Sequence, residues 1–311
     1  MSSSSYELGR DVRPSDLTFY YLLKGLAWGL VLLLLAMVGV IFALSWEALS
    51  HFGPGFFFDP SWDSWREQFG ALTFIYGTLV TSLIALILAV PVSLAVALFL
   101  NELAPSWLAR PLGFFVEMLA AIPSIVYGLW GLFVLAPFLR DHVQPPLGQY
   151  LGFLPLFQGP PMGVGMLAAG VILAIMIIPT IASISREVFR SVPATLREAA
   201  LGLGATRWEM LRLAVLKASV SGIVGAVVLG LGRALGETMA VTMVIGNRPQ
   251  IDWSLFESGQ TMASILANQY AEADSSLHLS ALTAVGFTLF VVSLAINSLA
   301  RWIIWRMQRV N

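Results

Sequence analysis

Residues 227–246 read VVLGLGRALGETMAVTMVIG, and two charged side chains, Arg233 and Glu237, interrupt this otherwise apolar stretch. With the apolar residues before it, the stretch covers 219–246, which is long enough to span a bilayer as a helix. A spacing of four residues puts both side chains on one helix face, about 6 Å apart along the axis. Burying either charge unpaired in the bilayer costs roughly 2.5–3.5 kcal/mol. We therefore predict that the pair faces a protein interior or a water-filled path, and we take it as the first candidate for function.

The composition is that of an integral membrane protein. Of the 311 residues, 58% are hydrophobic and only 11% are charged, whereas a soluble domain carries about 25% charged residues. The mean hydropathy is +0.81. We expect an all-α, polytopic membrane protein with an N-terminal tail (1–20) and one transmembrane domain (21–311). Stretches of the length that spans a bilayer lie near 23–46, 73–100, 115–138, 162–185, 219–246 and 279–303.

Basic residues are distributed unevenly between alternate loops. Most of the 17 Lys and Arg residues lie in the N-terminal tail, the 101–114 loop, the 186–217 loop and the C-terminal end. The alternate loops carry mainly Asp and Glu. Since cytoplasmic loops of membrane proteins are enriched in Lys and Arg, both termini are predicted to be cytoplasmic.

Several kinds of chemistry are disfavoured by the residues present. The chain has no cysteine, and its three histidines are scattered without ligand spacing. Its two lysines, Lys24 and Lys217, both follow leucine, so the Gly-Lys-Ser/Thr ending of a P-loop is missing. A membrane-embedded hydrolase would lack a nucleophile, a base or a metal cluster. We expect no enzyme site, cofactor or metal in this chain, and no nucleic-acid partner.

The longest predicted cytoplasmic loop, 186–217, has helical signals of its own. Pro193 fits the first turn of a helix, and Gly202 and Gly204 end that helix. Thr206 and Glu209 form a capping box that predicts a second helix through Leu216. One interpretation of this basic loop is an amphipathic helix resting on anionic lipid.

The same loop resembles the EAA motif of ABC importer permeases. The matching residues are Glu198-Ala199-Ala200 followed by Gly204, whereas the far end of the motif, I-x-L-P, is here Ala214-Val215-Leu216-Lys217. The resemblance implies the type I ABC importer permease fold. It also implies a coupling helix that docks on a nucleotide-binding subunit, so that ATP and Mg would be bound by that partner.

Two further stretches resemble the PstC family, the permease subunits of bacterial phosphate ABC importers. They are AAIPSIVYGLWGLFVLAPFLR (120–140) and LGLGRALGETMAVTMVIGN (229–247). The PstA sister family shares the Arg-Ala-x-Gly-Glu-Thr core, but its continuation differs from Met239-Ala240-Val241-Thr242. The resemblance implies alternating access in a bacterial cell (inner) membrane. The implied partners are a PstA-like permease, two copies of a PstB-like ATPase and an extracytoplasmic, PstS-like phosphate-binding protein.

In that family the arginine and glutamate of the fifth span are implicated in phosphate passage, and they correspond to Arg233 and Glu237. Thr238 and Thr242 flank Glu237 and are further candidates to line the path, although a mid-helix threonine usually bonds its own backbone. Three alternatives stay open. The pair could be a plain structural ion pair, the cargo could be another oxyanion such as sulfate or molybdate, or the chain could be a proton-coupled anion transporter with Glu237 as proton carrier.

Overall fold

The computed structural model describes the backbone of residues 14–310 and the side chains of residues 17–306. Of the predicted tail (1–20), residues 1–13 lie outside this part, and residues 14–20 form the first turns of helix α1. Six helical segments are long and apolar enough to cross a membrane, which confirms the all-α, six-span prediction. They run over Leu17–Phe57, Leu72–Leu103, Ser124–Leu151, Met166–Arg190, Arg207–Gly236 and Ser276–Arg306.

The fourth of these segments, α7 (Met166–Arg190), is the most buried of the six and forms the centre of the bundle. It packs against α2 (Leu72–Leu98) and α10 (Lys217–Gly236), its two most extensive partners. The core between them is built from side chains such as Ile172, Ile177 and Ile181 of α7, with Ala85 and Ala89 of α2. Functional side chains that contact α7 are therefore held by the most buried span of the fold.

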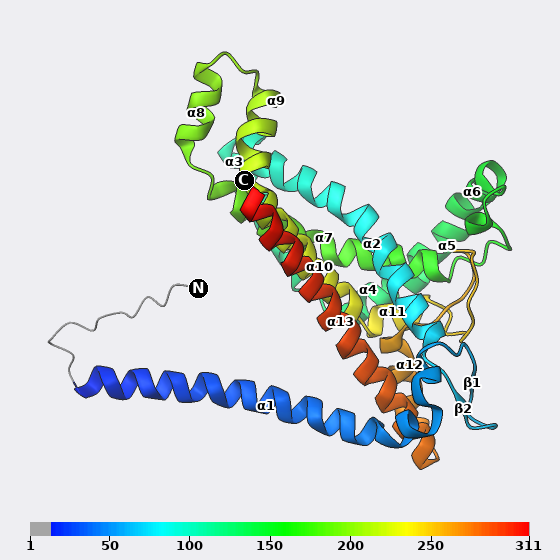
Figure 1. Cartoon of the computed structure of the whole chain (residues 1–311). Helices are drawn as coiled ribbons and strands as arrows, with labels where there is room; N and C mark the ends of the chain where they lie inside the picture. Colours follow the sequence, from blue (N-terminus) through cyan, green and yellow to red (C-terminus); the bar gives the residue numbers. More distant parts are fainter. Residues whose placement is uncertain (1–13, 311) are drawn as a thin grey trace.

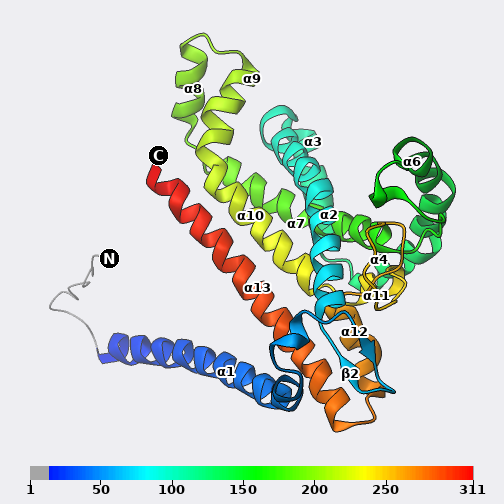
Figure 2. The same ribbon diagram turned by 45° about the vertical axis from the view of Figure 1, so that its right-hand side comes forward.

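The first helix, α1 (Pro14–Phe52), leaves the bundle. In both views it diverges from α13 (Ser276–Val310) toward its N-terminal end (Figures 1 and 2). Near its C-terminal end the backbone N–H of Ala48 donates to Ser280 Oγ at 3.0 Å, and that hydroxyl donates to the Leu44 carbonyl at 2.8 Å. The rest of the helix is lined by exposed leucine, valine and aromatic side chains, as expected of a lipid-facing span.

The third span differs from its predicted range, 115–138. Helix α3 (Ser106–Ala120) ends before Pro123, and α4 (Ser124–Trp130) begins after it. Proline has no backbone N–H and disfavours a helical residue before it, so it separates two helices here instead of kinking one. The span then continues past residue 138, its predicted end, and consists of η3 (Gly131–Leu135), α5 (Ala136–Phe138), η4 (Leu139–Val143) and α6 (Gln144–Leu151). A short helix, η5 (Pro155–Phe157), follows.

Smaller elements cover the two ends of the bundle. At one end lie η1 (Gly53–Phe57), the antiparallel strands β1 (Trp62–Asp63) and β2 (Gln68–Phe69), α12 (Met262–Gln269) and η7 (Tyr270–Glu272). The strands pair Trp62 with Phe69 and Asp63 with Gln68. Phe56, Phe69 and Phe74 are buried in the core of this end. The hairpin of α8 (Ala194–Gly202) and α9 (Arg207–Met210) projects at the opposite end (Figure 1).

Candidate functional site

The fifth span is broken at the candidate residues. Helix α10 ends at Gly236, Glu237 has extended backbone angles (φ −71°, ψ 125°), and α11 (Met239–Val244) follows Thr238. The prediction of one continuous helix over 219–246 is therefore wrong, and so is the placement of Arg233 and Glu237 on one face of it. Glycine is among the poorest helix formers, and here it ends the helix in the middle of the apolar stretch. The two charged residues belong to different structural elements.

Arg233 points toward two neighbouring helices. Its Nη1 donates to Thr180 Oγ1 of α7 at 3.2 Å, and its Nη2 donates weakly to the Ala120 carbonyl at 3.5 Å. Ala120 is the last residue of α3, where unpaired carbonyls and the helix dipole attract a cation. Tyr127 of α4 is buried beside this position and donates to the neighbouring Leu119 carbonyl at 2.9 Å. Thus α3, α4, α7 and α10 meet around one guanidinium.

The Arg233 charge has no carboxylate partner among the residues that the structure describes. The ion pairs of this region do not include it, and Glu237 instead accepts a hydrogen bond from the Ala240 N–H at 3.3 Å. A plain ion pair between Arg233 and Glu237, one of the alternatives, is therefore not formed. A guanidinium has five N–H donors, and only two of them bond here. The half-buried Arg233 keeps donors that an anion could accept from.

The two candidate threonines are turned toward their own backbone. Thr238 donates its hydroxyl proton to the Gly236 carbonyl at 3.3 Å, and Thr242 donates to the Thr238 carbonyl at 2.7 Å. A threonine hydroxyl has one proton, so each keeps only lone pairs for other partners. Sequence reasoning missed Thr180 and Tyr127, which contact the Arg233 region although they lie 53 and 106 positions away in the chain. Neither has a local signal, because both occur in ordinary apolar stretches.

The predicted coupling segment consists of a helix, a glycine turn and a second helix. Helix α8 begins after Pro193, and Gly204 has a positive φ of 85° that favours glycine. The capping box is present, with the Thr206 N–H donating to Glu209 Oε2 at 2.8 Å and the Glu209 N–H donating to Thr206 Oγ1 at 3.3 Å. The prediction that the second helix ends at Leu216 is wrong. The helix continues through the π-helical segment η6 (Leu211–Leu216) into α10, because nothing between them breaks the helix.

The residues of the motif lie on the surface of this hairpin. Glu198, Ala199 and Gly204 are exposed, while Ala200 is half-buried against the small core around Phe189. Large apolar side chains on the same hairpin are also exposed, namely Leu196, Leu201, Leu203 and Trp208. A projecting hairpin with an exposed carboxylate and apolar side chains is suited to contact another protein. Sequence reasoning missed the buried ion pair beneath it, between Glu102 and Arg197.

Comparison with known proteins agrees with this geometry. The family model described as "Binding-protein-dependent transport system inner membrane component" matches residues 89–309. The chain belongs to this family. The permease therefore has the role of a multi-pass membrane component, and the fold class inferred from its sequence is confirmed.

The most similar relatives carry one name. The permease is 47% identical over 308 residues to "Phosphate transport system permease protein PstC" of Xylella fastidiosa (strain 9a5c), covering 97% of this chain and 94% of that relative. It is 50% identical over 285 residues to the protein of the same name from Pasteurella multocida (strain Pm70), covering 90% and 88%. The resemblance to PstC permeases found in the sequence is thereby confirmed.

Solved structures share the fold at low sequence identity. A bacterial ABC transporter that imports the acidic polysaccharide alginate aligns with a TM-score of 0.59 at 19% identity, over 93% of the permease and 95% of that chain. The inward-facing MetNI methionine ABC transporter aligns with a TM-score of 0.56 at 18% identity, over 76% and 95%. Because both identities are low, these likenesses concern the fold alone.

Proposed function

We propose that this permease is the PstC-like subunit of an ATP-driven phosphate importer and that inorganic phosphate passes Arg233 on its way to the cytoplasm. The names of the relatives support phosphate as the cargo. The observation that carries the proposal is the Arg233 guanidinium, which has unused donors and no carboxylate partner within the described residues. An arginine fork matches the oxygens of phosphate in a bidentate way.

Glu237 is proposed to select for a protonated oxyanion. Its Oε1 accepts a hydrogen bond from the Ala240 N–H. The other carboxylate oxygen can then accept a hydrogen bond from a protonated oxygen of the cargo. Phosphate carries a proton near neutral pH and sulfate does not, so the carboxylate would attract the first and repel the second. Thr238 and Thr242, whose hydroxyl protons are bonded to the backbone, would line the path as acceptors or by shape.

The remaining subunits follow from this assignment. The permease would pair with a PstA-like permease, and two PstB-like ATPase subunits would bind ATP and Mg below the membrane. A PstS-like binding protein would deliver phosphate from the opposite side. The exposed residues Glu198, Ala199 and Gly204, with the half-buried Ala200, would form the ATPase contact. This requires the α8–α9 hairpin and both termini to be cytoplasmic in a bacterial inner membrane, in agreement with the distribution of Lys and Arg.

Uptake of labelled phosphate tests the proposal. The permease is produced with its neighbouring subunits in cells that lack their own high-affinity phosphate importer, with excess sulfate or an uncoupler added in parallel. Uptake that needs ATP and resists both additions is expected. Inhibition by sulfate would keep the architecture and change the cargo to another oxyanion. Loss of uptake with the uncoupler while ATP is maintained would favour a proton-coupled transporter.

A further inference from the structure

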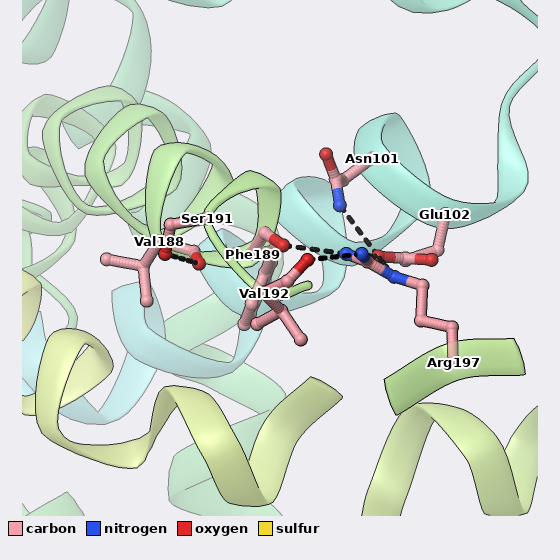
Figure 3. A network of polar contacts seen from close by, with 7 residues as sticks. All are labelled: Asn101, Glu102, Val188, Phe189, Ser191, Val192 and Arg197. Atoms are coloured by element: carbon pink, nitrogen blue, oxygen red, sulfur yellow. Dashed lines mark hydrogen bonds and ion pairs between the residues drawn. The ribbon is translucent and has the colours of Figure 1, made fainter. Parts of the chain in front are cut away.

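One half-buried side chain, Arg197, joins the α8 helix to two other elements. Arg197 donates from Nη1 to the Val192 carbonyl at 2.6 Å and from Nη2 to the Phe189 carbonyl at 2.7 Å, both at the C-terminal end of α7. From Nη2 and Nε it also donates to Glu102 Oε1, at 2.8 and 3.2 Å (Figure 3). A single guanidinium thus connects α8, the end of α7 and the end of the second span.

Glu102 is held in place for this contact. It lies in η2 (Phe99–Leu103), the π-helical turn that ends the second span, and its side chain is only 9% exposed. The same oxygen, Oε1, accepts the Asn101 side-chain amide at 2.7 Å. A carboxylate this buried is costly unless it is paired, and hydrogen bonds between a guanidinium and a carboxylate are stronger than those between neutral groups.

Apolar packing alone does not hold α8 against the bundle. None of its residues is buried; Ala200 is half-buried at the edge of the core formed by Ala97, Phe189 and Met210. Leu196 and Leu201 are exposed on the same helix. Within the described residues, Arg197 is therefore the main side-chain connection between α8 and the spans.

We propose that the Glu102–Arg197 pair is the link through which a displacement of α8 moves the cytoplasmic ends of the second span and of α7 together. This rests on the proposed function, in which a partner ATPase acts on the outer face of α8. Arg197 directly precedes Glu198, and successive helical residues point about 100° apart: the arginine contacts the spans, and the exposed glutamate is accessible to the partner. Glu102 and Arg197 are positioning residues, because they touch neither cargo nor nucleotide.

A second ion pair nearby provides a matched control. Glu187 and Arg190 lie 3.6 Å apart on one turn of α7, with side chains 75% and 51% exposed. Both residues belong to the same helix, so this pair connects no separate elements. Glu187→Ala, like Glu102→Ala, removes one carboxylate from this end of the molecule, but it leaves the contact between α8 and the second span intact.

The test compares transport with ATP hydrolysis in proteoliposomes that hold the whole complex. Glu102→Ala breaks the connection to the second span but leaves the two bonds from Arg197 to α7. At equal amounts of assembled complex, we expect the ratio of phosphate taken up to ATP hydrolysed to fall about tenfold, while Glu187→Ala leaves it within twofold of the unaltered complex. An unchanged ratio in Glu102→Ala would overturn the link, and so would a loss of assembled complex at constant ratio, which indicates a merely structural pair.

A second measurement needs no phosphate. The chain has no cysteine, so Leu103→Cys and Leu201→Cys, both at exposed positions, allow paired spin labels on the second span and on α8. The distance between the labels is expected to stay constant when ATP binds to the complex, and to change or broaden when Glu102→Ala is added. A distance that changes with ATP in the presence of Glu102 would overturn the link. Absence of phosphate uptake by the unaltered complex would instead overturn the proposed cargo and leave this distance test decisive.

Discussion

The guanidinium of Arg186 occupies the space that a side chain at residue 113 would need. An added Cβ at Gly113 of α3 would clash with Nη1 of Arg186 of α7. The side chain of Arg186 is only 10% exposed. Its Nη2 donates to the Ala109 carbonyl at 3.4 Å, and its Nη1 lies 3.8 Å from Oε1 of Glu117. Helix α3 is thus joined to α7 by an arginine that lies against a glycine.

Gly113→Ala should therefore destabilise the permease. The guanidinium must move away from α3 and lose its contacts with Ala109 and Glu117, and overpacking of this kind typically costs about 1–3 kcal/mol. We expect a lower midpoint of thermal unfolding in detergent. Gly225→Ala is the matched control, because an added Cβ there has nothing within 4 Å, and alanine is the better helix former. Equal midpoints for the two variants would contradict the packing role of Gly113.

Thr180→Val should weaken cargo binding without changing the amount of complex. Valine keeps the shape of threonine but removes the oxygen that accepts from Arg233 at 3.2 Å. A hydrogen bond to a charged group contributes about 1.5–3 kcal/mol, so the freed guanidinium should be less well oriented and the apparent KM for phosphate should rise about tenfold or more. Thr283→Val is the control, because that hydroxyl bonds its own backbone, the Leu279 carbonyl, in α13. A similar KM for both variants would remove Thr180 from the site.

Glu237→Gln should make the importer less selective against sulfate. The glutamine side chain still accepts the Ala240 N–H but no longer repels a fully ionised oxyanion. Competition assays with labelled phosphate are expected to show stronger inhibition by sulfate in the variant, with uptake in the absence of sulfate reduced less. Arg233→Lys provides a contrasting change, since it keeps the positive charge but loses the planar fork, and should lower uptake of any oxyanion. If Glu237→Gln leaves both uptake and sulfate exclusion unchanged, the selective role of Glu237 is wrong.

Substitutions at Gly204 should show whether backbone conformation or side-chain size limits what this position tolerates. Its φ is 85°, and an added Cβ would have nothing within 4 Å. The cost of a side chain there is therefore conformational, roughly 1–2 kcal/mol for an L residue in this region and less for asparagine. We expect ATP-dependent uptake to be highest in Gly204→Asn, lower in Gly204→Ala and lowest in Gly204→Val. Higher uptake in Gly204→Ala than in Gly204→Asn would indicate that size matters more than conformation, as at a partner contact.

The number of spans could be predicted because an apolar stretch of sufficient length is a property of the sequence alone. Where a span breaks depends on what the broken ends bond to. Pro123 and Gly236 can be read from the sequence as possible helix breaks. Proline and glycine are nevertheless tolerated inside membrane helices when neighbouring helices satisfy the freed backbone groups. At the end of α3 the Ala120 carbonyl accepts from Arg233, which comes from a distant part of the chain, and the Leu119 carbonyl accepts from Tyr127 of the next helix.

The candidate site could be predicted only in part for the same reason. Arg233 was identifiable because a charge in an apolar stretch is costly wherever it points. Its partner Thr180 was not, since a threonine after a proline in a span usually bonds its own backbone. Arg197 could not be singled out, because it is one of six basic residues in the 186–217 segment. Its ion pair with Glu102 distinguishes it from the other five, and that contact depends on the tertiary structure.

The continuity of α9, η6 and α10 makes the outer hairpin and Arg233 two ends of one rod. From Arg207 to Arg233 the rod is about 39 Å long at the usual rise of 1.5 Å per residue. Pivoted at its hairpin end, such a rod converts a tilt of about 5° into a shift of roughly 3 Å at Arg233. That shift is comparable with the length of a hydrogen bond. A small rocking of the surface hairpin is thus enough to bring the guanidinium into or out of reach of an oxyanion, without any rearrangement inside the helix.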